Sequence, residues 1–189
     1  MPPKVKITKE EIVKAALELL RRDGDAAVNA RNIAASLGCS TQPIFSNFAT
    51  MESLQQAALE AAYDFYLHFL QNEAEKGTYP VYKAYGMAYI RFAKEERELF
   101  KRLFMCDRRG ADLSPTADFV ASVEYIVKNN DVTQETAERM HLEMWAFVHG
   151  VATMQATSFL ELDEELISRM QTDVYQGLRA RHTAKEEQS

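Results

Sequence analysis

A row of short polar side chains within residues 41–47 could read the edges of DNA bases. The row consists of Thr41, Gln42, Ser46 and Asn47. Ile44 and Phe48, four residues apart, would face inward on the opposite side of a helix. Glutamine and asparagine can each make two hydrogen bonds to adenine, and serine and threonine can reach phosphates or a thymine methyl group. The pattern indicates a helix that enters a major groove of double-stranded DNA. Each side chain taken alone could equally cap a helix or be solvated.

The segment before this row predicts a second helix and a tight turn. Ile33, Ala34 and Leu37 form a small apolar face, and Gly38 can adopt the left-handed backbone that ends a helix. We expect Cys39 to be a small buried filler rather than a redox switch. We expect Ser40 to be the N-cap of the following helix, where Pro43 is tolerated in the first turn. This arrangement is a helix-turn-helix.

The flanking segments predict the other helices that such a small domain needs. Thr8 and Glu11 form a capping box, and an apolar stripe of helical spacing follows at Ile12, Val13, Ala16, Leu17 and Leu20. After the turn, Thr50 caps a long helix that we expect to reach about Asn72.

At this point the chain resembles the N-terminal domain of the tetracycline-repressor (TetR) family of transcriptional regulators, strongly so over residues 7–60. The matching residues are Ile12-Val13-x-x-Ala16-Leu17-x-x-Leu20, Asp23-Gly24, Ala30-Arg31-Asn32-Ile33-Ala34-x-x-Leu37-Gly38-Cys39-Ser40 and Ile44-Phe45-Ser46-Asn47-Phe48-x-x-Met51-Glu52-x-Leu54. The resemblance implies a helix-turn-helix DNA-binding domain at 1–50. It also implies a helical ligand-binding and dimerisation domain at 51–189, with 51–72 as the connecting helix.

Two positions depart from the family pattern. The family usually has a tyrosine at the position of Phe45 and a lysine at the position of Met51, and both typically contact phosphate. Phe45 cannot donate a hydrogen bond and Met51 carries no charge, which puts those two contacts in doubt. The helix N-terminus at Met51 still offers backbone N–H groups to a phosphate.

Arg31 has an outward position if Ile33 and Ala34 face inward, and arginine is the commonest reader of guanine. A solvated helix-surface charge is the alternative. The candidate DNA-contacting residues are Lys6, Asn29, Arg31, Ser40, Thr41, Gln42, Phe45, Ser46 and Asn47.

Charge is divided unevenly along the 189 residues. The net charge is −6, but residues 1–50 carry seven Lys/Arg against five Asp/Glu, a net of +2. We therefore expect modest, strongly salt-dependent non-specific DNA binding. No apolar run approaches the length of a membrane span and no signal-peptide core is present, so we expect a cytoplasmic protein without a membrane partner. Its two cysteines fit a reducing compartment.

The chain after residue 72 has helical patterns throughout. Thr133 opens a long helix whose middle, residues 144–154, is apolar nearly all round, and Asp163 caps a last helix. A helix with two apolar faces must be buried on both. We expect a homodimer through the last two helices, about 133–160 and 163–182, which would match a pseudo-palindromic operator. Ser114-Pro115 predicts another helix start.

Aromatic side chains suggest a site for a small apolar or aromatic effector. Tyr82, Tyr85, Tyr89 and Phe92 share one helix face, and Trp145-x-x-x-His149-Gly150 resembles a signature of one branch of TetR-like C-terminal domains. The candidate ligand-binding residues are Tyr85, Tyr89, Phe92, Phe104, Trp145 and His149. An ordinary aromatic core and a satisfied core histidine are the alternatives.

Catalytic and metal patterns are weak. Glu138-x-x-His141 is half of a di-iron motif, and the four histidines lack zinc spacing with either cysteine. We found no phosphate loop, nucleophile elbow or paired carboxylates. We therefore expect no catalytic residues, no metal and no cofactor.

These observations predict an all-α protein: a three-helix helix-turn-helix domain followed by a helical ligand-binding and dimerisation domain. The expected function is a ligand-responsive regulator, most simply a repressor. The rivals are a helical carrier or enzyme for a hydrophobic metabolite whose helix-turn-helix is not functional, and a regulator that has lost its ligand or acts as an activator.

Overall fold

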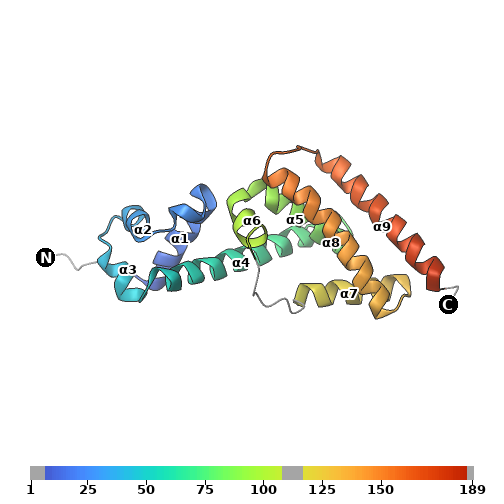
Figure 1. Cartoon of the computed structure of the whole chain (residues 1–189), viewed down its shortest axis with the longest axis horizontal. Coiled ribbons are helices and arrows are strands. Elements are labelled where there is room, and N and C mark those ends of the chain that lie inside the picture. Colours follow the sequence, from blue (N-terminus) through green and yellow to red (C-terminus); the bar gives the residue numbers. More distant parts are fainter. Residues whose placement is uncertain (1–6, 108–116, 187–189) are drawn as a thin grey trace. The chain divides into compact units, whose positions relative to one another are not determined.

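The computed structural model describes residues 7–107 and 117–186, and it confirms the all-α class (Figure 1). Within those residues the regular elements are helices α1 (Lys9–Asp23), η1 (Asp25–Ala27, a 3₁₀ turn), α2 (Ala30–Ser36), α3 (Gln42–Asn47), α4 (Met51–Glu75), α5 (Val81–Glu95), α6 (Arg97–Phe104), α7 (Ala117–Asn130), α8 (Gln134–Ala156) and α9 (Glu164–Glu186). Two sequence predictions fall outside the described residues, namely Lys6 as a DNA contact and Ser114-Pro115 as a helix start.

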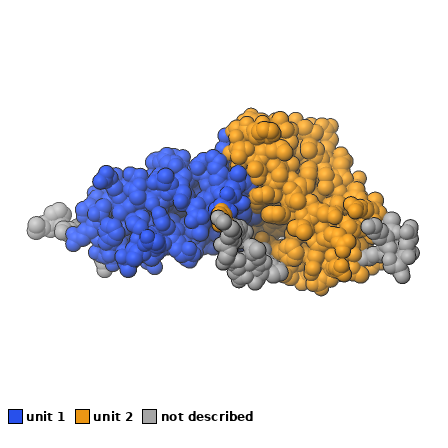
Figure 2. Space-filling view, viewed as in Figure 1, with its two compact units in different colours: residues 1–69, 95–106 blue, residues 70–94, 107–189 orange. Residues whose placement is uncertain are grey.

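The chain forms two compact units, and each consists of two separate stretches of the sequence (Figure 2). Unit 1 comprises residues 1–69 and 95–106, and unit 2 comprises 70–94 and 107–189. The helix-turn-helix therefore belongs to the same compact unit as α6, which follows it by some fifty residues in the sequence and packs on α1. The helix α4 has its first part in unit 1 and its last turns in unit 2.

Helix α1 starts at the predicted capping box. The Thr8 hydroxyl accepts from the Glu11 N–H at 3.2 Å, and the Glu11 carboxylate accepts from the Thr8 N–H at 2.8 Å. The predicted apolar stripe of α1 is only partly the buried face. Ile12, Ala16 and Leu20 are buried as predicted, but Leu19 completes the buried face while Val13 and Leu17 are half-buried. The capping box determines where the helix begins. Which apolar side chains of the helix are buried depends on the elements that pack against it.

The helix-turn-helix is formed by α2, a turn and α3. Gly38 has φ +63°, as the turn requires. The prediction that Ser40 caps the second helix was wrong: Thr41 occupies the N-cap position, and its carbonyl accepts from the Ile44 N–H at 3.2 Å. Thr41 has nearly helical backbone angles, and its side chain makes no capping bond. Cys39 is half-buried rather than fully buried.

Helix α4 begins where Thr50 predicts, since the Thr50 hydroxyl accepts from the Ser53 N–H at 3.2 Å. It extends to Glu75, one turn beyond the predicted end. Its buried positions recur every four residues, which gives one continuous inward stripe. They are Leu54, Ala58, Ala62, Tyr66 and Leu70.

In unit 2, α7 packs against α8, and α8 lies beside α9 (Figure 1). The Thr133 and Asp163 caps are both present, each side chain accepting a backbone N–H three residues later. The prediction that the penultimate helix extends to about residue 160 was wrong, because α8 ends at Ala156. Ser158 has φ +54°, so the chain turns out of the helix there, and Phe159 beyond it is 80% exposed.

Candidate functional site

The outer surface of α2 and α3 presents three unengaged polar side chains. Arg31, Thr41 and Gln42 are exposed, and within the described residues no hydrogen bond or ion pair engages their side chains. Ile33, Ala34 and Ile44 are buried beneath them. With the apolar side chains buried and the polar ones exposed, a guanidinium, a hydroxyl and a carboxamide are available to a partner. These are groups that can hydrogen-bond to base edges and phosphates.

Three other predicted DNA contacts are exposed or half-buried but engaged locally. The Ser46 hydroxyl donates to the Gln42 carbonyl at 2.9 Å, and Asn47 Nδ2 donates to the Pro43 carbonyl at 2.8 Å. Asn29 caps α2, since its Oδ1 accepts from the Asn32 N–H at 3.0 Å. These side chains hold the helices in shape, and binding DNA through their donors would require breaking those bonds.

Ser40 and Phe45 are also exposed on this surface, with Phe45 at 52%. A large exposed phenyl ring on a short polar helix contributes no hydrogen bond. It offers apolar contact to a sugar or to a thymine methyl group.

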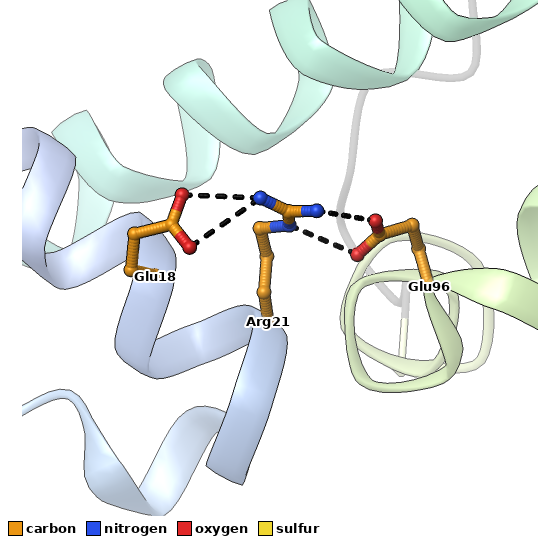
Figure 3. Close-up of polar contacts among 3 residues, drawn as sticks. All are labelled: Glu18, Arg21 and Glu96. Atoms are coloured by element: carbon orange, nitrogen blue, oxygen red, sulfur yellow. Dashed lines mark hydrogen bonds and ion pairs between the residues drawn. The ribbon is translucent and has the colours of Figure 1, made fainter.

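Two ion pairs between residues distant in sequence join the α6 region to the rest of unit 1. Arg21 of α1 donates through Nε to Glu96 Oε2 at 2.9 Å and through Nη2 to the other carboxylate oxygen, while Nη1 donates to Glu18 at 3.1 Å (Figure 3). The bonds to Glu96 raise the pKa of Arg21, so this guanidinium stays charged. Arg102 of α6 adds a bond to Asp25 at 2.9 Å. These bonds link the α6 region to α1 and to η1, the 3₁₀ turn that precedes the helix-turn-helix.

The predicted dimer surface on α8 is uncovered in the single chain. Leu142 is 59% exposed and Trp145 is 47% exposed, and Phe159 and Leu160 just beyond the helix are also exposed. The opposite face of α8 is buried through Met140, Met144 and Val148, among others. Helix α8 therefore has the second apolar face that the sequence predicts. No part of the described chain packs over that face.

Three of the six predicted ligand-binding residues meet in unit 2. Trp145 stacks on His149 with ring centroids 4.9 Å apart and an interplanar angle of 9°. The Tyr89 hydroxyl and His149 Nδ1 share a hydrogen bond of 2.9 Å. Burial lowers the pKa of His149 and raises that of Tyr89, so both are neutral at pH 7.

The other three predicted ligand-binding residues lie elsewhere. Phe92 is fully buried, Tyr85 is 42% exposed, and Phe104 belongs to unit 1, where its ring meets Tyr66 at 4.9 Å. Among the described residues nothing lies within 4 Å of the position that a Cβ would take at Gly150, so close helix approach there does not require this glycine.

A cavity of about 330 Å³ lies in unit 2, at a place that the sequence did not indicate. Its aromatic lining is Tyr82 of α5, Tyr125 of α7 and Tyr175 of α9. The Tyr82 and Tyr125 rings stack with centroids 5.6 Å apart, and Tyr175 meets Tyr82 at the same distance. Tyr82 belonged to the predicted aromatic stripe, but its partners come from distant helices and have no shared spacing.

One residue of the lining is bonded to a histidine, since the Tyr82 hydroxyl and His141 Nδ1 share a hydrogen bond of 2.9 Å. Burial lowers the pKa of His141, opposed by the Asp118 carboxylate, and burial raises the pKa of Tyr82. Neutral His141 is thus part of the folded structure.

We predict that this burial makes stability fall in mild acid. Since the folded-state pKa of His141 lies below its ordinary value of about 6.5, the unfolded state binds more protons below that pH. Stability is therefore lost as pH falls from about 6.5 through the folded-state pKa. Urea unfolding at pH 7 and pH 5.5 should show a smaller loss for His141→Gln than for the wild type. His68→Gln, at an exposed histidine, is the control for residue type. An equal loss of stability in His141→Gln and the wild type would show that His141 does not cause the loss.

Within the described residues, no group of three His, Cys, Asp or Glu side chains is placed to hold a metal ion. Glu138 of the half motif accepts instead from Gln134 Nε2 at 2.9 Å. None of the described helices has the length and apolar character needed to cross a membrane.

Comparison with known proteins adds one finding. A family model described as the C-terminal domain of tetracyclin repressor-like proteins matches residues 82–174. The matched range includes α7, α8 and part of the cavity lining, and it begins after the helix-turn-helix. No curated protein matches the chain.

Proposed function

Because the chain belongs to the tetracycline-repressor family of regulators, we propose that it is a homodimeric transcriptional repressor that a small molecule releases from a pseudo-palindromic operator. Regulators of this family are generally not enzymes, and we propose no catalytic role or cofactor here. We place the protein in the cytoplasm, together with the DNA that it would control.

The observation that carries the DNA-binding proposal is the surface of α2 and α3. A buried apolar face positions two short helices, and Arg31, Thr41 and Gln42 lie exposed and unengaged above it. In a major groove, α3 would bring Gln42 to an adenine edge, and Arg31 would reach a guanine or a phosphate. Residues 1–50 remain the proposed DNA-binding domain, with α6 supporting them as part of unit 1.

The dimer proposal is supported by the uncovered apolar face of α8. A two-fold axis would place this face against the same face of a second chain, with α9 alongside, and would bury Leu142 and Trp145. Two recognition helices related by that axis would read two half-sites of inverted sequence.

The ligand response requires coupling between the two units. The chain passes from one unit to the other within α4, near the end of α5 and after α6. We propose that ligand held in unit 2 favours a dimer whose recognition helices are spaced unlike those of the DNA-bound form. Ligand can lower operator affinity only by the ratio of its affinities for the two states.

The test is a selection from a random duplex pool with wild type and with Gln42→Ala. We expect an inverted repeat with the wild type, and a loss of preference at one position in each half-site with Gln42→Ala. A mismatch at a read base costs about 1–3 kcal/mol, so that position should lose a factor of about ten in discrimination. Gln134→Ala, which removes the same residue type from an exposed position on α8, should leave the motif unchanged. An equal loss of affinity for every sequence in Gln42→Ala would assign Gln42 to the DNA backbone instead.

A further inference from the structure

We propose that the cavity of unit 2 binds a small aromatic carboxylate. The inference rests on the proposed function, because it names the chemical class of the effector. The cavity, about 330 Å³, lies at the small end of the range for ligand sites in proteins. Residues from α5, α7, α8 and α9 line it, so a ligand there would touch four helices of the unit.

The walls favour a flat apolar body. Tyr82, Tyr125 and Tyr175 supply ring surface, and Met144 of α8 adds a flexible apolar contact. The Tyr82 hydroxyl is already bonded to His141, and the Tyr175 hydroxyl lies 2.9 Å from Asn130 Nδ2. These rings are therefore fixed in orientation and offer ring faces and edges to a planar ligand.

The charge of the lining favours an anion. Lys83 and Arg179 both line the cavity, and no Asp or Glu does so among the described residues. Lys83 Nζ donates to the neutral Thr172 hydroxyl at 2.8 Å and lies 4.9 Å from the centre of the Tyr79 ring. Within that part of the chain Lys83 makes no ion pair. A half-buried ammonium without a counter-ion gains more from a carboxylate than an exposed one does.

Gln171 supplies an independent observation. It is only 2% exposed and lines the cavity, yet its Oε1 is buried and lacks a hydrogen-bond partner within the described residues. A Cβ at Gly86 would overlap Gln171 Nε2, so the absence of a side chain at Gly86 leaves room for this amide. A buried acceptor is costly unless something donates to it. The cavity lining therefore contains an amide whose hydrogen-bonding capacity is not fully used within the described residues.

The experiment measures ligand binding without DNA. Full-length protein, unfolded and refolded to remove any bound molecule, is titrated calorimetrically with phenylacetate and naphthalene-2-acetate and with the two corresponding neutral amides. Each acid and its amide share the same ring and nearly the same shape, so their difference reports the charge. We expect at least one acid to bind about tenfold more tightly than its amide, since hydrogen bonds to charged groups are the stronger ones.

Two variants locate the effect. Lys83→Met should lower the affinity of that acid about tenfold and change the affinity of the amide by less than about twofold. Lys128→Met removes the same charge from an exposed position of α7 and should change neither. Circular dichroism of both variants checks that they fold.

Either of two results would overturn the inference: no acid binding more tightly than its amide, or Lys83→Met and Lys128→Met affecting acid binding equally. These failures are distinct from failure of the proposed function. A protein that selects an operator but binds acids and amides alike would keep its function as a regulator and lose only the ligand class assigned here.

Discussion

Leu142→Asp is expected to convert the dimer into a monomer and to remove measurable operator binding. Leu142 is 59% exposed on the uncovered face of α8, where a two-fold contact would bury it. Burying one leucine side chain contributes about 1.5–3 kcal/mol, and the substitution occurs twice in a dimer. Because only the exposed part of each side chain is newly buried, its loss alone would weaken the dimer by at least about tenfold, and a buried carboxylate would weaken it further. Sedimentation velocity at micromolar concentration measures the change.

Val81→Asp is the matched control for this change. Val81 is 57% exposed, close to the exposure of Leu142, but it lies in the first turn of α5, where an aspartate is favourable. It should remain dimeric. A wild-type protein that sediments as a monomer, or a Leu142→Asp protein that sediments as a dimer, would contradict the proposed interface.

Phe100→Ala is expected to destabilise unit 1 and to weaken DNA binding, although residue 100 lies far from the helix-turn-helix in sequence. Phe100 on α6 is fully buried, its ring meets Phe104 at 5.3 Å, and α6 packs on α1. Removing a buried phenyl group costs about 3–5 kcal/mol. Hydrogen exchange should show faster exchange of the α1 amides, because they share a compact unit with Phe100.

Met105→Ala is the control, because it shortens a side chain just after α6 that is 41% exposed. This substitution should lower the free energy of unfolding only slightly. If Phe100→Ala left the exchange of α1 unchanged while α8 lost protection, α6 would belong energetically to unit 2. Helices α1 and α6 would then not unfold as one cooperative unit.

Several features could be predicted from the sequence because they depend on nearby residues. Helix starts at Thr8, Thr50, Thr133 and Asp163 are confirmed, since capping joins groups only three residues apart. Gly38 was found because a left-handed turn favours glycine. Ser40 shows the limit of this reasoning, because two adjacent hydroxyl residues suit the same cap and the backbone placed Thr41 there.

Features that depend on distant pairs could not be predicted. Arg21 and Glu96 are separated by 75 residues, and nothing near either one marks the other as its partner. The cavity is formed in the same way, because Tyr82, Tyr125 and Tyr175 meet only after three helices pack. Tyr85, Tyr89 and Phe92 were predicted as ligand residues because they share a helix face, but helical spacing cannot distinguish a core face from a cavity wall. Phe92 accordingly proved to be buried core.

The most direct test of sequence-specific DNA binding is the ratio of two affinities. The dissociation constant for the selected operator is compared with that for a scrambled duplex of equal length and composition. Both are measured by fluorescence anisotropy across a salt titration, with protein as purified and after refolding to remove ligand. We predict tighter operator binding by a factor of about a thousand or more, with both affinities falling steeply as salt rises. A ratio near one at every salt concentration, in both preparations, would show that the protein does not bind DNA sequence-specifically.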